Sequence, residues 1–101
     1  MSHYIIVSRH PAAIAFIRET DPRFANAPVV AHATADDVRG RHVAGNVPMH
    51  LAALATRVTA VEFTGTPPRG AEYTVGDMRA AGARVATYEV RHAPPDVGLE
   101  V

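Results

Sequence analysis

Short apolar runs alternate along this chain with segments whose apolar residues recur at helical spacing, and this alternation constrains the fold more than any other feature. The first run, residues 4–8, is rich in β-branched side chains, which is typical of a strand buried on both faces of a parallel sheet. Pro11 suits the first turn of a helix, which the polar residues 20–22 then end. Because strands that alternate with helices build mostly parallel sheets with helices on both faces, we expect an α/β domain of Rossmann-like type.

Four further apolar runs predict the remaining strands of one sheet. They are residues 28–33, 42–45, 60–64 and 84–90. A chain of 101 residues can bury one hydrophobic core but not two, so we expect a single domain over residues 1–92. Residues 93–101 contain prolines and a glycine without any periodicity, which predicts a loose tail.

Two further helices are expected between these strands. Pro48 opens one of them. Thr74 starts the other, because Asp77 three residues later approximates a capping box, and Gly82 ends it after Ala81. The apolar face of the helix that follows Pro48 comprises Leu51, Leu54, Ala55 and Val58.

The composition excludes several classes of function. Ten basic residues balance ten acidic ones, so no general electrostatic field would draw the protein onto duplex nucleic acid. The absence of cysteine excludes a disulfide framework and a zinc ribbon, and His42 and His50 do not have a recognisable metal-ligand spacing. We therefore expect no metal and no cofactor. No apolar run is long enough to span a membrane and no signal-peptide core is visible, so we expect a cytoplasmic protein.

Two turns that follow buried strands carry the candidate functional residues. When their prolines are aligned, residues 8–12 match residues 45–49, and each set lies between a strand and a helix. The first turn of a helix exposes backbone N–H groups at the positive end of the helix dipole, so both turns can bind an anion. Arg9 adds a forked donor that matches phosphate, whereas His10 and His50 can move protons near neutral pH. The other candidate binding residues of the two turns are Ser8, Pro11, Asn46, Val47 and Pro48.

Each of these side chains also has a plain structural interpretation. Arg9 could be solvated, and His10 could be an N-cap whose ring lies in water. His50 could hydrogen-bond to Asn46. Their convergence at two equivalent turns favours a shared functional site.

Four residues outside the two turns are less informative. Arg69 lies in a loop stiffened by prolines and could fold over a ligand as part of a lid, although an exposed loop arginine often only contacts water. His3, His32 and His92 have no partner that the sequence identifies, so we expect each of them to be structural or exposed.

Three groups of residues carry a resemblance to a known family. They are Ser8, Arg9, His10 and Pro11; Gly45, Val47, Pro48, His50, Leu51 and Ala52; and Arg69, Gly70, Glu72, Asp77, Met78, Gly82 and Ala83. Over nearly its whole length the chain resembles a small family of accessory proteins encoded beside type III CRISPR systems. Members of that group and its neighbours are regarded as ring nucleases, which open cyclic oligoadenylate second messengers and so switch off the antiviral response.

The resemblance implies a fold, a ligand and a reaction. It implies a CARF-like domain that forms a homodimer, whose two-fold symmetry suits cyclic tetra-adenylate. The implied cleavage is independent of metal: a ribose 2′-hydroxyl attacks the adjacent phosphorus and leaves a 2′,3′-cyclic phosphate. Arg9 and the backbone amides after it would stabilise the phosphoryl charge, and either His10 or His50 would transfer the proton. The substrate contacts would be Ser8, Pro11, Asn46, Val47, Pro48 and Arg69.

Two other functions remain open at this point. A binding module that sequesters or senses the same messenger would use the same anion contacts, and only the histidines at both turns favour the enzyme over it. The other alternative is a domain that binds a mononucleotide in its crevice, although the chain has neither the glycine-rich fingerprint nor the phosphate-loop lysine of such domains.

Overall fold

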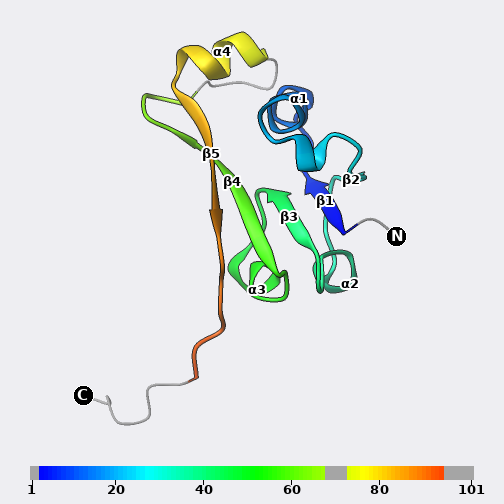
Figure 1. The fold of residues 1–101 in the computed structure, drawn as a ribbon. Helices are drawn as coiled ribbons and strands as arrows, with labels where there is room; N and C mark the ends of the chain where they lie inside the picture. The colour runs from blue at the N-terminus through cyan, green and yellow to red at the C-terminus, as the bar shows by residue number, and fades with distance from the viewer. Residues whose placement is uncertain (1–2, 68–72, 95–101) are drawn as a thin grey trace, which may run out of the picture.

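A computed structural model describes residues 3–67 and 73–94, and its five strands form one sheet in the order β2-β1-β3-β4-β5 (Figure 1). The strands are β1 (Tyr4–Val7), β2 (Val29–Val30), β3 (His42–Gly45), β4 (Arg57–Phe63) and β5 (Ala83–Tyr88). The first four run parallel, whereas β5 runs antiparallel to β4. The predicted α/β domain with a mostly parallel sheet is confirmed.

Helices cover both faces of this sheet. They are α1 (Pro11–Thr20), the 3₁₀ helix η1 (Pro22–Phe24), α2 (Ala35–Val38), α3 (Met49–Ala52) and α4 (Val75–Ala80). Alternate residues of β1 point to opposite faces: Ile6 packs with α1 and η1, whereas Ile5 and Val7 pack with α2 and α3. The helix α4 lies against α1 (Figure 1). Across residues 3–67 and 73–94, no helix has the length and apolar character that crossing a bilayer requires.

The helix starts follow the sequence signals closely. Pro11 occupies the first position of α1, as predicted. Thr74 caps α4: its hydroxyl accepts the N–H of Asp77 at 3.0 Å, and the Asp77 carboxylate accepts the N–H of Thr74 at 2.9 Å. Thr34 and Asp37 form the same capping box at α2, a helix that the sequence analysis did not predict. Each such cap contributes about 1 kcal/mol to helix stability.

The helix predicted after Pro48 is shorter than its apolar spacing indicated. Pro48 is the N-cap of α3, which ends at Ala52 after a single turn. Val58, which we placed on the apolar face of that helix, lies in β4, and this strand already begins at Arg57. The reason is tertiary pairing, because Val58 lies in register with Val43 and the ladder to β3 competes successfully with a weak helix propensity.

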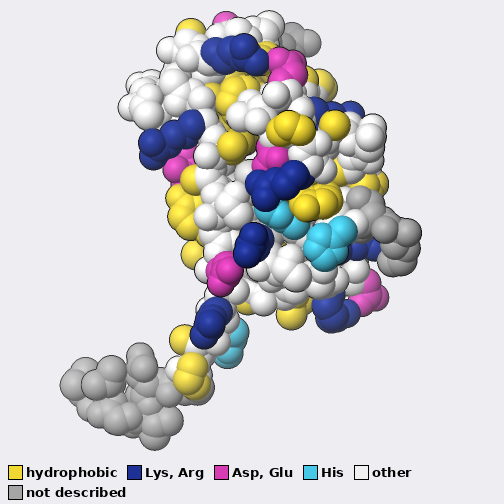
Figure 2. Space-filling view, viewed as in Figure 1, with side chains coloured by type: hydrophobic (Ala, Val, Ile, Leu, Met, Phe, Trp, Pro, Cys, Tyr) yellow, Lys and Arg dark blue, Asp and Glu magenta, His cyan; other side chains and the backbone are white. Residues whose placement is uncertain are grey.

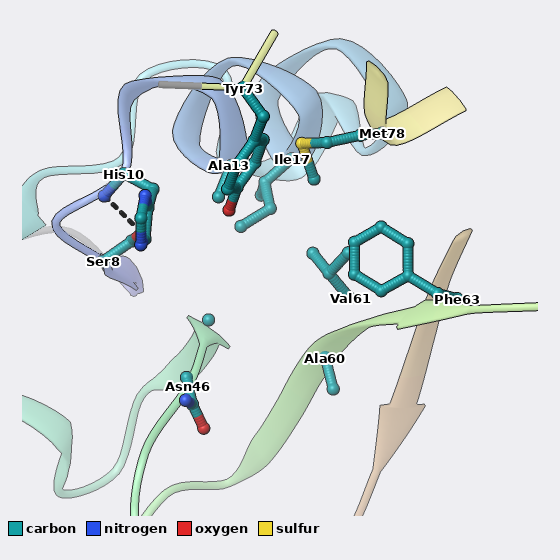
Figure 3. Close-up of a pocket in the computed structure, with 11 residues that line it drawn as sticks. Ser8, His10, Ala13, Ile17, Asn46, Ala60, Val61, Phe63, Tyr73 and Met78 are labelled. Atoms are coloured by element: carbon teal, nitrogen blue, oxygen red, sulfur yellow. Dashed lines mark hydrogen bonds between the residues drawn. The ribbon is translucent and has the colours of Figure 1, made fainter. Parts of the chain in front are cut away.

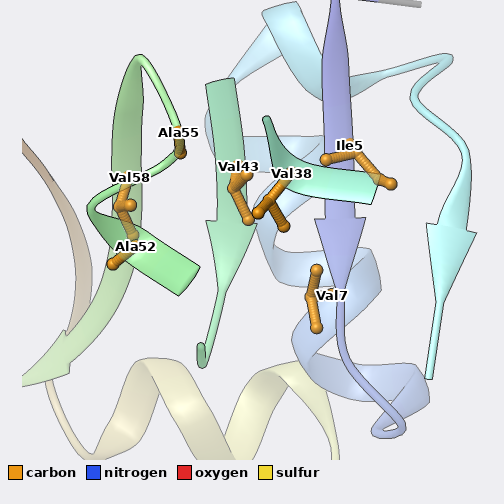
Figure 4. Packing of buried hydrophobic residues seen from close by; sticks show 7 residues of the cluster. All are labelled: Ile5, Val7, Val38, Val43, Ala52, Ala55 and Val58. Atoms are coloured by element: carbon orange, nitrogen blue, oxygen red, sulfur yellow. The ribbon is translucent and has the colours of Figure 1, made fainter. Parts of the chain in front are cut away.

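Two clusters of buried side chains form the core, one on each face of the sheet. Figure 4 shows the cluster between the sheet and the helices α2 and α3. Its buried members are Ile5, Val7, Val38, Val43, Ala52, Ala55 and Val58. Each fully buried Val or Ile side chain contributes roughly 1.5–3 kcal/mol of transfer free energy, so this cluster holds α2 and α3 on one face of the sheet.

Beyond the end of β3, the strand β4 continues without β3 as a neighbour, and we call this divergence the fork of the sheet. The ladder between β3 and β4 ends at Ala44 opposite Thr59, whereas β5 pairs with β4 as far as Phe63. At the end of β3, Gly45 has a φ of +119°, and a Cβ atom there would lie 2.0 Å from the carbonyl oxygen of Val7. Only glycine permits this close approach of β3 to β1 at the point where both strands end.

Three polar side chains, from β3, β4 and β5, are joined by hydrogen bonds across the sheet. His42 is buried, and its Nε2 atom lies 2.7 Å from the hydroxyl of Thr59, which lies 2.8 Å from the hydroxyl of Thr87. The His42 ring also packs against the rings of Tyr4 and Phe24. Burial lowers the pKa of His42 below its ordinary value of 6.5, and the positive charge of nearby arginines lowers it further. This histidine is therefore a neutral part of the core near neutral pH.

We expect the free energy of unfolding to decrease as the pH falls from 7 to about 5.5, and we expect the replacement His42→Gln to weaken this dependence. Below pH 6.5 the unfolded chain binds a proton at His42 that the folded chain excludes. The contribution of neutral His42 to the free energy of unfolding is therefore complete above pH 6.5, and it is lost as the pH falls below this value. Urea unfolding at several pH values measures the slope. His92→Gln, at an exposed histidine, is the matched control, and an equal slope in both variants would contradict the assignment.

Candidate functional site

The turns that follow β1 and β3 meet at one edge of the sheet. Val7 lies opposite Gly45 in the register, so the two strands end side by side. The strand order changes direction between β1 and β3, because β2 lies on the other side of β1. Ligands of open α/β sheets bind at such a switch point, beyond the carboxyl ends of the strands. The fold thus brings residues 8–10 and Asn46 together where a ligand is expected.

Two adjoining cavities open at this switch point. The fork cavity has a volume of about 430 Å³ and lies between α1 and the second half of β4 (Figure 3). The basic cavity has a volume of about 310 Å³ and lies between the turn after β1 and the segment after β2. Ser8, His10 and Asn46 line both cavities. Among the other lining residues are Ile17, Phe63, Tyr73 and Met78 in the fork cavity, and Arg9 and His32 in the basic cavity.

His10 stands at the boundary between the two cavities. It is the N-cap of α1, but its side chain does not cap the helix. Its backbone N–H donates to the hydroxyl of Ser8 at 3.1 Å, and its ring stacks on that of Tyr73 with centroids 5.2 Å apart. The ring is thus held by stacking, and its nitrogen atoms form no hydrogen bond within residues 3–67 and 73–94. A histidine in this state can exchange a proton with a bound ligand.

Arg9 and His32 give the basic cavity its character. Neither side chain forms an ion pair with a described carboxylate, in contrast to Arg23, which binds Asp21 at 2.6 Å. No acidic side chain is among the described residues that line either cavity. Elsewhere arginines are spread over the surface, several of them beside acidic residues, as Figure 2 shows for one face. The basic cavity therefore favours an anion locally, although the chain as a whole is neutral.

The first turn of α1, which follows Arg9 and His10 directly in the chain, offers backbone donors. Pro11 has no N–H group, and the N–H of Ile14 donates to the carbonyl oxygen of His10. The N–H groups of Ala12 and Ala13 have no such partner among the described residues. They lie at the positive end of a ten-residue helix, where an anion is stabilised.

The turn after β3 is not equivalent to the turn after β1. This corrects the match between residues 8–12 and 45–49 that the aligned prolines suggested. The helix α3 has only four residues, so its dipole is much weaker than that of α1. His50 is exposed on α3 and lines neither the fork cavity nor the basic cavity. Asn46 is exposed, and no hydrogen bond joins it to His50. Val47 and Pro48 line a third cavity of about 240 Å³, which also includes Asn46.

The predicted contacts also included Pro11 and Arg69. Pro11 begins α1 but lines neither of the two adjoining cavities. Arg69, which we expected in a lid, lies outside the described residues. In the described part of the chain, no group of three or more histidine, aspartate or glutamate side chains could hold a metal ion.

Sequence reasoning missed three residues of this region. His32 follows β2, whose carboxyl end lies at the same edge as those of β1 and β3, and this position in the strand order could have identified it. Phe63 and Tyr73 come from opposite sides of the fork cavity, and neither shows a motif in the sequence. Phe63 lies at the end of β4 and Tyr73 directly before the N-cap of α4, so only the tertiary structure brings them to one cavity.

The comparison with known families identifies the group to which this chain belongs. Residues 5–91 match a family described as "Putative CRISPR-associated protein (Cas_VVA1548)". No curated protein and no solved structure matches the chain. The matched residues include β1 from Ile5 onward, the other four strands, both turns and every described residue that lines the two adjoining cavities. The CRISPR association that the sequence indicated is confirmed, and the chain belongs to this family of CRISPR-associated proteins.

Proposed function

We propose that the protein is a ring nuclease that binds cyclic oligoadenylate, and cyclic tetra-adenylate in particular, and cleaves it to end type III CRISPR signalling. The observation that carries the proposal is the basic cavity, in which Arg9 and His32 lie beside the first turn of α1 without an acidic neighbour among the described residues. Such a cavity suits a phosphate, and cyclic oligoadenylate is a ligand that carries several of them. Membership in a CRISPR-associated family is consistent with this ligand.

The proposed reaction requires positioning, one proton acceptor and charge stabilisation. The ribose 2′-oxygen attacks the adjacent phosphorus, so that a new P–O2′ bond forms and the P–O5′ bond breaks. The products are linear and end in a 2′,3′-cyclic phosphate and a 5′-hydroxyl. The ring of His10 accepts the 2′-hydroxyl proton, and the leaving 5′-oxygen takes up a proton from solvent or from protonated His10. Arg9 and the N–H groups of Ala12 and Ala13 stabilise the charge on the phosphoryl oxygens.

This chemistry requires neither a protein nucleophile nor a bound metal. Serine and histidine are present at the site, but the nucleophile belongs to the substrate itself. The protein contributes by holding the 2′-oxygen in line with the bond that breaks. We further propose that two copies of the chain form a homodimer, since the symmetry of a ring of four nucleotides suits paired sites.

The wild-type protein should convert cyclic tetra-adenylate to linear products in excess chelator, and Arg9→Ala should lower both affinity and cleavage rate. Loss of a charge-assisted phosphate contact corresponds to roughly a tenfold to hundredfold decrease. Rings of different sizes are incubated with the protein, and products are separated by chromatography. The exposed Arg39, which pairs with Asp36 away from both cavities, provides the control Arg39→Ala.

Three outcomes would contradict parts of this proposal. Tight binding without any cleavage would indicate the sequestering module instead of the nuclease. Complete dependence of cleavage on added magnesium or manganese would refute the metal-independent reaction. Light scattering of the same samples gives the mass, and a monomer with and without ligand would refute the homodimer.

A further inference from the structure

The fork cavity differs in chemistry from the basic cavity beside it. Its walls are mainly apolar, with Phe63 on β4 and Tyr73 on the opposite side (Figure 3). No arginine, aspartate or glutamate is among the described residues that line it. Its volume of about 430 Å³ falls within the range of small-molecule sites. The cavity therefore suits an uncharged, flat group, next to a cavity that suits an anion.

Phe63 is not required to fill the protein core. It belongs to neither buried cluster, and it lies at the end of β4, beyond the reach of β3. Its side chain is half-buried, and no described aromatic ring stacks on it. An aromatic face that lines a cavity and has no aromatic partner among the described residues can stack on a nucleobase.

The opposite wall of the fork cavity continues to the proposed proton acceptor. Tyr73 stacks on His10 with an interplanar angle of 27° and ring centroids 5.2 Å apart, so the two rings lie face to face at the edge of the fork cavity. His10 lines the basic cavity as well. A ligand group bound beside Tyr73 in the fork cavity would therefore be separated from an anion in the basic cavity only by His10 and its neighbours.

Asn46 supplies polar groups at the same boundary. It lines both cavities, and its carboxamide forms no hydrogen bond with the described residues. A carboxamide presents a donor and an acceptor side by side, which match the N7 acceptor and the N6 amino group of adenine. Hypoxanthine has a 6-oxo group in place of the amino group and cannot form this pair of bonds.

We propose that the fork cavity holds one adenine base of the ring, stacked on Phe63 and recognised by Asn46, while the basic cavity holds the phosphate that is cleaved. This assignment rests on the proposed function and names the part of the substrate that each cavity takes. A nucleotide carries its base and its phosphate on one sugar, so it needs two adjoining compartments. The ribose then lies at their boundary, beside His10.

Phe63→Leu should weaken the binding of cyclic tetra-adenylate about tenfold or more, because leucine keeps the apolar volume but loses the stacking face. The rate of cleavage of the bound ring in single turnover should change much less, since Phe63 does not contact the reacting atoms. The matched control is Leu54→Ala, which removes a side chain of 38 % exposure outside both cavities and should leave affinity unchanged. Thermal unfolding of both variants verifies that they are folded.

The preference for adenine provides a second measurement. The wild-type protein should bind cyclic tetra-adenylate roughly tenfold or more tightly than the corresponding ring of inosine nucleotides. Asn46→Ala should reduce this preference to near unity, mainly by weakening the binding of the adenine ring. Competition between the two rings for each variant measures the ratio directly.

The two proposals fail in different ways. If the wild-type protein cleaves the ring, but Phe63→Leu and Asn46→Ala bind both rings as the wild type does, the base assignment is refuted and the nuclease stands. If the wild-type protein binds no cyclic oligoadenylate, but binds adenosine 5′-monophosphate in a manner that depends on Phe63, the nuclease is refuted and the base site stands. If neither ligand binds, both proposals are refuted.

Discussion

Replacing His10 with alanine is expected to slow the single-turnover cleavage of cyclic tetra-adenylate by about a hundredfold or more, while the affinity for the ring changes little. His10 lines both cavities, and its ring nitrogen atoms form no hydrogen bond with the described residues. Its loss removes the proton acceptor of the proposed reaction without removing the guanidinium of Arg9. His10→Gln should show the same loss, because glutamine keeps a planar polar group but cannot exchange a proton near neutral pH.

His50→Ala is the matched control for this experiment. His50 is exposed on α3 and lines neither of the two cavities, so the rate of cleavage should stay close to that of the wild type. A large loss of rate in His50→Ala, with normal cleavage in His10→Ala, would assign the proton transfer to His50. Wild-type rates in both variants would mean that Arg9 and the backbone amides carry the reaction by positioning alone.

The replacement Gly45→Ala is expected to destabilise the protein by about 3–5 kcal/mol. The φ of +119° is unfavourable for alanine, and its Cβ atom would lie 2.0 Å from the carbonyl oxygen of Val7. Because that oxygen belongs to the backbone of a central strand, relief requires β1 and β3 to separate. Since domains of this kind are stable by about 5–15 kcal/mol, the loss is a large fraction of the total. Urea unfolding measures it.

Gly40→Ala separates the two causes of this effect. Gly40 also has a positive φ, +72°, but a Cβ atom there would meet nothing within 4 Å. The replacement Gly40→Ala should therefore lower the free energy of unfolding only by the backbone strain, about 1–2 kcal/mol. Equal losses in both variants would show that the close contact between β1 and β3 contributes little to stability.

Local signals in the sequence predicted much of the architecture correctly. The apolar run at residues 4–8 and Pro11 predicted β1 and the start of α1, and Thr74 with Asp77 predicted the cap of α4. These features depend on side chains that lie within a few residues of one another, so the chain alone determines them. The same alternation of elements led us to expect a candidate site beyond the carboxyl ends of the parallel strands, and two cavities open there.

The composition of the site depended on contacts between distant segments. The sequence placed Arg9 and His10 after β1, but it treated the turns of His10 and His50 as equivalent. The structure distinguishes them, because α1 has ten residues whereas α3 has four. His32 joins Arg9 only because β2 pairs with β1, and that pairing joins residues far apart in the chain.

The sequence by itself thus determined the class of fold, the helix starts and the turn that carries Arg9 and His10. Each of these follows from local propensity and apolar spacing, which act over a few residues. Only the tertiary structure decided that Val58 belongs to a strand, that the sheet forks after Thr59, and that Phe63 faces Tyr73 across a cavity. These features arise from strand register, which is set by the packing of the whole sheet rather than by any local pattern.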